Sequence, residues 1–216
     1  MIDTTRLVEI RWHGRGGQGA VLSTELIAQA AINEGNLAQA FPSFGPERRG
    51  ALVQAFIRIS NKEPIRIRSG ITEPDVVVVL DPSLLRVANV TSGLKEDGML
   101  VINTSKSFQE IESEFKVRQT LAIIDATKIA REELGIPIVN TSMIGALIRA
   151  TGIVKLESLV EPLQHRFGRL AKRNISAMKK AYQETSVLEV GLLKPEDINW
   201  CQKMDVLINR GESVKE

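Results

Sequence analysis

A glycine-rich turn, Gly14–Gly19, is the feature that most constrains how this chain can fold. It follows an apolar run, Leu7–Trp12, and precedes a stretch of helical periodicity that begins near Ala20. Glycine tolerates positive φ and lets another group approach the backbone closely. The N-terminus of the helix behind the turn exposes unpaired N–H groups with partial positive charge. This order of strand, glycine turn and helix therefore predicts an α/β unit whose turn is suited to binding an anion.

The turn has the glycine spacing of a dinucleotide-binding fingerprint, because Gly14, Gly16 and Gly19 fit G-x-G-x-x-G. That fingerprint also needs an acidic residue about 20 residues further on, at the end of the second strand. The second strand expected here, Leu37–Phe41, leads instead into a charged loop with two prolines and two glycines, Pro42–Gly50. Function must therefore be explained by two loops rather than by one cofactor fingerprint.

Alternating strand and helix patterns run through most of the chain. The clearest strand is Asp75–Leu80, whose apolar run indicates burial on both faces of a parallel sheet. Residues 51–59 and 65–68 alternate around a turn and predict a hairpin with a solvated basic face, and residues 108–116 look like a solvated connector. Further strands are expected at 99–102, 121–124 and 136–139, and further helices at 84–88, 127–134, 142–152, 156–163 and 175–182.

These patterns predict an α/β fold with a mostly parallel, mixed sheet and C-terminal helices. We expect one domain over residues 1–185 and a C-terminal extension over 186–216 that packs on the domain or on a neighbouring subunit.

Composition excludes several classes of function. A net charge of +2 over 216 residues argues against a nucleic-acid-binding protein. One cysteine, Cys201, cannot build a four-cysteine cluster, and with only two histidines a metal site is not expected. No apolar run is long enough for a membrane span, and no secretory leader is visible, so the expected location is the cytoplasm.

Two stretches together carry a family resemblance: Glu9–Ala20, which ends in the glycine turn, and Ala40–Ala51, which contains the charged loop. Shorter matches follow at 58–60, 64–66, 73–76 and 140–146. The pair resembles the gamma subunits of the 2-oxoacid:ferredoxin oxidoreductases, most closely those of the pyruvate type (pyruvate synthase).

The resemblance implies a subunit of an enzyme complex that converts pyruvate to acetyl-CoA and CO2 with electrons passing to ferredoxin, or runs the reverse. Thiamine diphosphate with Mg²⁺ would lie in the alpha and beta subunits, and iron–sulfur clusters in a delta subunit. The gamma subunit would be a Rossmann-like three-layer sandwich that packs on these partners and contributes to the coenzyme A site. The resemblance implies no catalytic residue in this chain, so the chain alone is expected to be inactive.

Three alternatives remain open at this point. Ala51 after Gly50 is typical of the pyruvate and branched-chain types, so a 2-oxoisovalerate enzyme is equally compatible. A stand-alone NAD(P)-dependent oxidoreductase would use Gly14–Gly19 for a pyrophosphate. A pure interaction module would bind no ligand at all.

Two sets of candidate residues follow from these loops. The first, a phosphate/CoA or interface loop that is otherwise a tight turn, consists of Gly14, Arg15, Gly16, Gly17, Gln18 and Gly19. The second, an interface or anion loop in preference to a solvated turn, consists of Phe44, Gly45, Pro46, Glu47, Arg48, Arg49 and Gly50.

Four further polar residues lie near predicted strand ends or helix starts. Asn103 and Lys106 follow a strand at the edge where α/β ligands usually bind. Asn140 precedes a helix, and a helix cap is the favoured interpretation. His13 adjoins the glycine turn and is expected to be a packed structural residue rather than an acid–base catalyst.

Overall fold

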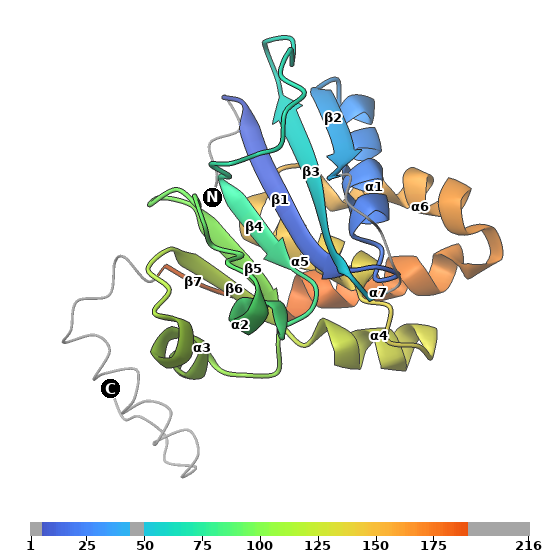
Figure 1. Cartoon of the computed structure of the whole chain (residues 1–216). Helices are drawn as coiled ribbons and strands as arrows, with labels where there is room; N and C mark the ends of the chain where they lie inside the picture. The colour runs from blue at the N-terminus through green and yellow to red at the C-terminus, as the bar shows by residue number, and fades with distance from the viewer. Residues whose placement is uncertain (1–5, 44–49, 190–216) are drawn as a thin grey trace, which may run out of the picture.

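The computed structural model describes residues 6–43 and 50–189, and within these ranges the strands form a single mixed sheet (Figure 1). The strands are β1 (Val8–Arg15), β2 (Leu37–Pro42), β3 (Leu52–Ser60), β4 (Val76–Val79), β5 (Met99–Asn103), β6 (Thr120–Ile124) and β7 (Ser186–Leu188). The helices are α1 (Ala20–Asn33), α2 (Leu84–Val87), α3 (Phe108–Phe115), α4 (Ala126–Leu134), α5 (Asn140–Thr151), α6 (Val160–Phe167) and α7 (Ala171–Glu184), with 3-10 turns η1 (Leu156–Leu159) and η2 (Gly168–Leu170).

The strand order is β2-β3-β1-β4-β5-β6-β7. The β1–β4, β4–β5 and β5–β6 pairs are parallel, whereas β3 is antiparallel to both β1 and β2, and β7 is antiparallel to β6. Strands β1, β2, β4, β5 and β6 therefore point the same way, and only β3 and β7 oppose them. The expected α/β fold with a mostly parallel, mixed sheet is confirmed.

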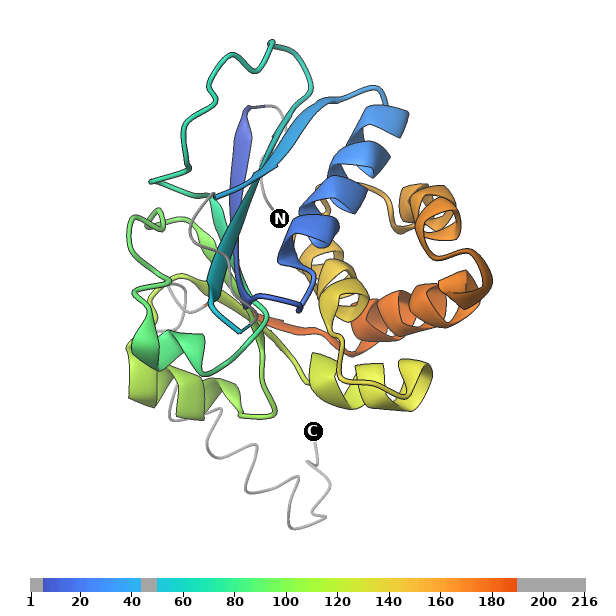
Figure 2. The ribbon, with the colours of Figure 1, turned by 45° about the vertical axis from the view of Figure 1, so that its right-hand side comes forward.

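Helices cover the two faces of the sheet unequally (Figures 1 and 2). Helices α1, α4, α5, α6 and α7 lie on one face, and the short helices α2 and α3 lie on the other, over the β4–β6 half. Strand β4 shows why its sequence is apolar throughout: Val76 and Val78 join the larger core, while Val77 and Val79 join the smaller core under α2 and α3. A strand buried on both faces cannot alternate with polar residues.

The face of β1 and β3 opposite α1 carries charged side chains and is covered by coil rather than by helix. Two buried arginines hold that coil in place. Arg11 donates to the carbonyls of Ile71 (3.2 Å) and Val90 (3.0 Å), and Arg58 donates to those of Ile67 (3.1 Å) and Ser69 (2.9 Å). Buried backbone carbonyls need partners, and here guanidinium groups supply them in place of a strand ladder.

The predicted hairpin over 51–68 is therefore wrong in its second half. Strand β3 forms as predicted, but its antiparallel neighbours are β1 and β2, so no edge remains for residues 65–68. Arg58, predicted to be solvated, is 1% exposed and pairs with Glu9 at 2.8 Å. The side chains of Arg66 and Arg68 are exposed, as expected.

Two further local predictions need correction. Residues 108–115 form helix α3 rather than a connector, because Ser107 and Glu110 make a reciprocal capping box at its start. Residues 136–139 form no strand and lead directly into α5. The extension predicted over 186–216 stays a prediction: its start, Ser186–Leu188, forms β7 against β6, and residues 190–216 lie outside the described residues.

No helix within the described ranges is long and apolar enough to cross a membrane.

Candidate functional site: two joined loops at the carboxyl edge of the sheet

The glycine turn and the end of the charged loop lie against each other. Antiparallel pairing places Arg15, at the end of β1, opposite Leu52, at the start of β3. Beyond that pair, Gly16 N donates to Ala51 O at 2.9 Å, and Gly50 N donates to Gly16 O at 3.3 Å. The sheet register thus brings Gly50, the end of the charged loop, against a glycine turn about 35 residues earlier in the sequence.

Most of the second candidate set cannot be placed in this site. Phe44, Gly45, Pro46, Glu47, Arg48 and Arg49 lie outside the described residues, and Gly50 is the one member that the structure describes.

Gln18 fills the inside of the glycine turn. Its Oε1 accepts a hydrogen bond from Arg15 N at 2.7 Å, which closes the turn on itself. A Cβ on Gly14 would stand 2.9 Å from Leu80 Cδ1 and 3.3 Å from Gln18 Oε1, so a larger residue there would require these side-chain ends to shift. Gly17 has φ +95°, is exposed and has nothing near a notional Cβ, so its glycine serves the backbone conformation alone.

Arg15 joins three segments through its guanidinium group. Its Nε donates to Asp81 Oδ2 at 2.8 Å, its Nη2 to Ser83 Oγ at 2.9 Å, and its Nη1 to Gly50 O at 3.3 Å. Partial burial alone would raise the pKa of Asp81, but hydrogen bonds from Ser83 and Arg15 and the charge of Arg15 hold it below its ordinary value. The charge of Arg15 is therefore balanced within the chain.

Asp81 is a site residue that the sequence reasoning missed. It follows β4, and its Oδ1 accepts from Ser83 N at 2.9 Å, as short polar side chains do at turns. The available signal was the run Asp81-Pro82-Ser83 directly after the most buried strand, at the edge where α/β folds place ligands.

Asn140 also reaches the glycine turn, but it is not the helix cap that was predicted. Val139 occupies the cap position of α5 without a side-chain cap, and Asn140 is the first helical residue. Its side chain lies against Gly19, which has φ +81° and heads α1. Asn140 Oδ1 is buried without a hydrogen-bond partner among the described residues. The cap prediction failed because α5 begins two residues earlier than the sequence pattern indicated.

Asn103 secures the neighbouring strand ends. Its Nδ2 donates to Leu80 O (2.9 Å) and to Thr127 Oγ1 (3.0 Å), and its Oδ1 accepts from Thr127 N (3.2 Å). These bonds tie the ends of β4 and β5 to the start of α4. The side chain is 3% exposed, and its amide groups are already hydrogen-bonded within the chain. Asn103 therefore stabilises the carboxyl edge of the sheet and offers no free group to a ligand.

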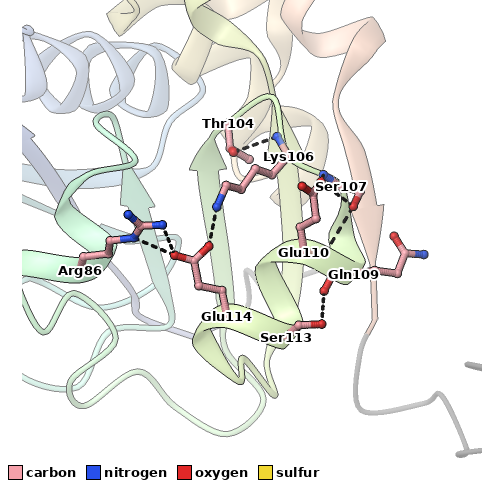
Figure 3. Close-up of polar contacts among 8 residues, drawn as sticks. All are labelled: Arg86, Thr104, Lys106, Ser107, Gln109, Glu110, Ser113 and Glu114. Carbon is pink, nitrogen blue, oxygen red and sulfur yellow. Dashed lines mark hydrogen bonds and ion pairs between the residues drawn. The ribbon is translucent and has the colours of Figure 1, made fainter.

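Lys106 belongs to a different cluster, shown in Figure 3. Its ammonium group pairs with Glu114, and Arg86 Nε bonds the same carboxylate at 2.7 Å. Hydrogen bonds from Lys106 and Arg86 outweigh desolvation and lower the pKa of Glu114. Of the three secondary candidates, only Asn140 touches the glycine turn directly.

His13 is packed, as predicted. It is 4% exposed, and its Nε2 accepts from Arg11 Nε at 3.0 Å. Burial first, and the Arg11 charge second, lower its pKa from 6.5 to about 4, so the ring is neutral at neutral pH. A neutral ring engaged at Nε2 is suited to structure rather than to proton transfer.

The site differs from a dinucleotide site in strand order. In the NAD-binding arrangement, the strand that carries the ribose-binding acid lies parallel and next to β1. Here β3 separates β2 from β1, and β2 lies at the edge of the sheet. Over the described ranges, no group of three or more His, Cys, Asp or Glu side chains could hold a metal ion.

Comparison with known proteins identifies the family. The pyruvate ferredoxin/flavodoxin oxidoreductase family matches residues 9–184. The pyruvate/ketoisovalerate oxidoreductases common subunit gamma of Pyrococcus furiosus is 53% identical over 186 residues, which are 85% of this chain and 100% of that protein.

Solved structures agree with this assignment. The pyruvate oxidoreductase subunit PORC of Thermotoga maritima is 39% identical with a TM-score of 0.75, covering 84% of this chain and 98% of that one. A 2-oxoglutarate:ferredoxin oxidoreductase of Magnetococcus marinus, solved with 2-oxoglutarate, coenzyme A and succinyl-CoA bound, shares the fold at 21% identity and a TM-score of 0.69 over 88% of this chain and 32% of that chain. The chain belongs to the pyruvate ferredoxin/flavodoxin oxidoreductase family, as a gamma subunit.

Proposed function

We propose that this gamma subunit serves a pyruvate-oxidising (or pyruvate-forming) complex by presenting its two joined loops to the partner subunits beside the coenzyme A site. The observation that carries the proposal is the pair of bonds between Gly16 and the Gly50–Ala51 segment. They place Gly50, the end of the charged loop, against the glycine turn at the carboxyl edge of β1, where α/β proteins bind ligands. Arg48 and Arg49, next to Gly50 in sequence, supply cations for a phosphate or an acidic partner.

The cofactors of the complex are assigned to other subunits. A single cysteine in the whole chain cannot ligate an iron–sulfur cluster, and the described residues hold no acidic or histidine group suited to Mg²⁺. The described residues therefore do not fit thiamine diphosphate with Mg²⁺, and the whole chain has too few cysteines for a cluster. We assign thiamine diphosphate to the alpha and beta subunits, and the clusters that reduce ferredoxin to a delta subunit.

The choice between pyruvate and 2-oxoisovalerate need not be exclusive. The Pyrococcus relative is named as common to both oxidoreductases, and 53% identity over its whole length supports the same arrangement here. Under this proposal the 2-oxoacid is selected by the catalytic subunits, while the gamma subunit serves whichever complex it joins in the cytoplasm. Neither nucleic acid nor a membrane is a partner.

Purification of the tagged chain from its native host under anaerobic conditions tests the proposal. We expect larger subunits, bound iron, and dye reduction that depends on both CoA and a 2-oxoacid. Assays with pyruvate and with 2-oxoisovalerate then show whether one complex or two are recovered. Recovery of a colourless chain without partners would contradict the proposal.

A second arm separates contact with CoA from assembly alone. Arg48→Ala and Arg49→Ala in the assembled complex are expected to raise the KM for CoA while leaving the KM for the 2-oxoacid unchanged. A lower yield of assembled complex, with an unchanged KM for CoA in the complex that does form, would support the pure interaction module instead.

A further inference from the structure

We infer that Asp81 is a positioning residue for the acyl-transfer step: it orients Arg15 and, through Arg15, fixes Gly50 at the end of the charged loop. This inference rests on the proposed function, because it concerns the same two loops. It adds a residue from a third segment, the turn between β4 and α2, to which neither the sequence motifs nor the comparisons assign a role.

The hydrogen bonds of Asp81 hold its carboxylate in one position between its own turn and Arg15. Its carboxylate is held from its own turn by Ser83 N (2.9 Å) and from across the sheet edge by Arg15 Nε (2.8 Å). Proline at position 82 restricts the same turn. Strand β4, which ends two residues before Asp81, is fully buried, so the turn that carries the carboxylate follows directly from the core of the sheet.

Arg15 transmits this position to the charged loop. A guanidinium group is planar, so when Nε is held by Asp81, the directions of Nη1 and Nη2 follow. Nη2 then meets Ser83 Oγ at 2.9 Å, and Nη1 meets Gly50 O at 3.3 Å. Gly50 has φ +84°, a conformation that glycine adopts without strain, and its N–H bonds Gly16 O. Gly50 is thus held on both its N–H and C=O sides by the first loop.

Charge supports the same interpretation. The Arg15 side chain is 34% exposed and that of Asp81 is 18% exposed, so the pair lies at the surface of the edge rather than in the core. Ion pairs that solvent still reaches contribute only modestly to stability. The main effect of this pair is therefore to hold three segments in position. Removing it should loosen residues 50–53 more than it lowers the stability of the whole chain.

The test uses the assembled complex with Asp81→Asn, Asp81→Glu and Arg15→Lys. The matched control is Asp97→Asn, which removes the same charge from an exposed acid, 3.7 Å from Arg6, in the turn before β5 at the opposite edge. Two quantities are measured: amide hydrogen exchange of the peptides containing Gly16 and residues 50–53, and the KM for CoA together with kcat.

We expect Asp81→Asn to speed exchange at residues 50–53 about tenfold and to raise the KM for CoA about fivefold with kcat within about twofold. Asp81→Glu keeps the carboxylate and should recover most of both effects. Arg15→Lys keeps the charge but offers a single nitrogen, and it should reproduce the Asp81→Asn phenotype, which keeps the inference testable if Asp81→Asn does not assemble. The control should change neither quantity.

Three results would overturn the inference. Unchanged exchange at residues 50–53 in Asp81→Asn would show that Asp81 does not hold Gly50. Faster exchange with an unchanged KM, in a complex where Arg48→Ala does raise the KM, would leave the proposed function standing and remove Asp81 from it. If Arg48→Ala also leaves the KM unchanged, the proposed contact of the loops with CoA fails, and the role of Asp81 fails with it.

Discussion

Asn140 Nδ2 lies 2.9 Å from the point where a Cβ on Gly19 would stand. The contact joins the first residue of α5 to the residue that precedes α1, and Ser23 Oγ adds a long bond of 3.5 Å to Asn140 O. The N-termini of the two helices thus meet behind the glycine turn. Gly19 is a glycine for two reasons: its φ is +81°, and the space beside it is occupied by the Asn140 amide.

The first prediction follows from that contact. Gly19→Ala should destabilise the chain by about 2–4 kcal/mol, because a left-handed residue is strained and a close contact is added. Gly17→Ala is the matched control: φ is +95° there, but nothing stands within 4 Å of the added Cβ, so only the strain of about 1 kcal/mol remains. Denaturant unfolding measures both. Equal losses would show that Asn140 yields without cost.

Helix α5 supplies a second prediction at Gly145. A Cβ there would stand 2.1 Å from Met178 O in α7, and backbone in a packed helix cannot move aside cheaply. We expect Gly145→Ala to cost more than about 3 kcal/mol or to prevent folding. Ala150→Gly, in the same helix, should cost about 2 kcal/mol, from helix propensity and the loss of one buried methyl group. A folded Gly145→Ala chain with wild-type stability would show that α5 and α7 can separate.

The pKa of His13 predicts an acid-sensitive fold. Burial and the Arg11 charge lower this pKa from 6.5 to about 4. Between these pH values His13 is therefore protonated in the unfolded chain but neutral in the folded chain. The resulting stability is complete above pH 6.5 and is lost as the pH falls towards 4, by up to about 3 kcal/mol.

His13→Gln tests this prediction, because Gln has no proton to gain and its Oε1 can still accept from Arg11 Nε. Unfolding free energies between pH 4 and 7 should have a shallower slope in the variant. Identical slopes in the two proteins would mean that other groups govern the acid sensitivity.

Arg58 predicts a local effect on the coil that covers the sheet. Its guanidinium bonds Glu9 and the carbonyls of Ile67 and Ser69, and lies 5.3 Å from the Phe41 ring centroid. Arg58→Met leaves these part-buried partners without the guanidinium that they bond, and it should cost about 3 kcal/mol.

Limited proteolysis should then cut within residues 61–70 before the rest of the chain unfolds. Arg66→Met, in the exposed part of the same coil, is the control and should stay within about 0.5 kcal/mol of wild type. Cleavage elsewhere first would show that Arg58 does not hold the coil.

The elements predicted well are those whose evidence is local. Helix α1 ends at Asn33, two residues before Gly35 (φ +85°), and α4 ends at Leu134, just before Gly135 (φ +77°), as their glycines indicated. The apolar run of β4 needed no knowledge of its neighbours. The sequence evidence for α3 was also local. Ser107 and Glu110 have the spacing of a capping box, which was not recognised when residues 108–116 were predicted to be a connector.

The amino-acid sequence by itself determined the α/β class, the two loops and the family, because periodicity, glycines and motifs are properties of short segments. Only the tertiary structure decided that Arg58 is buried, that β2 and not residues 65–68 pairs with β3, and that Asp81 reaches Arg15. The physical reason is that a charged side chain is buried or solvated according to which carbonyls and acids surround it. Those partners come from distant segments, which the order of strands in the sheet brings together.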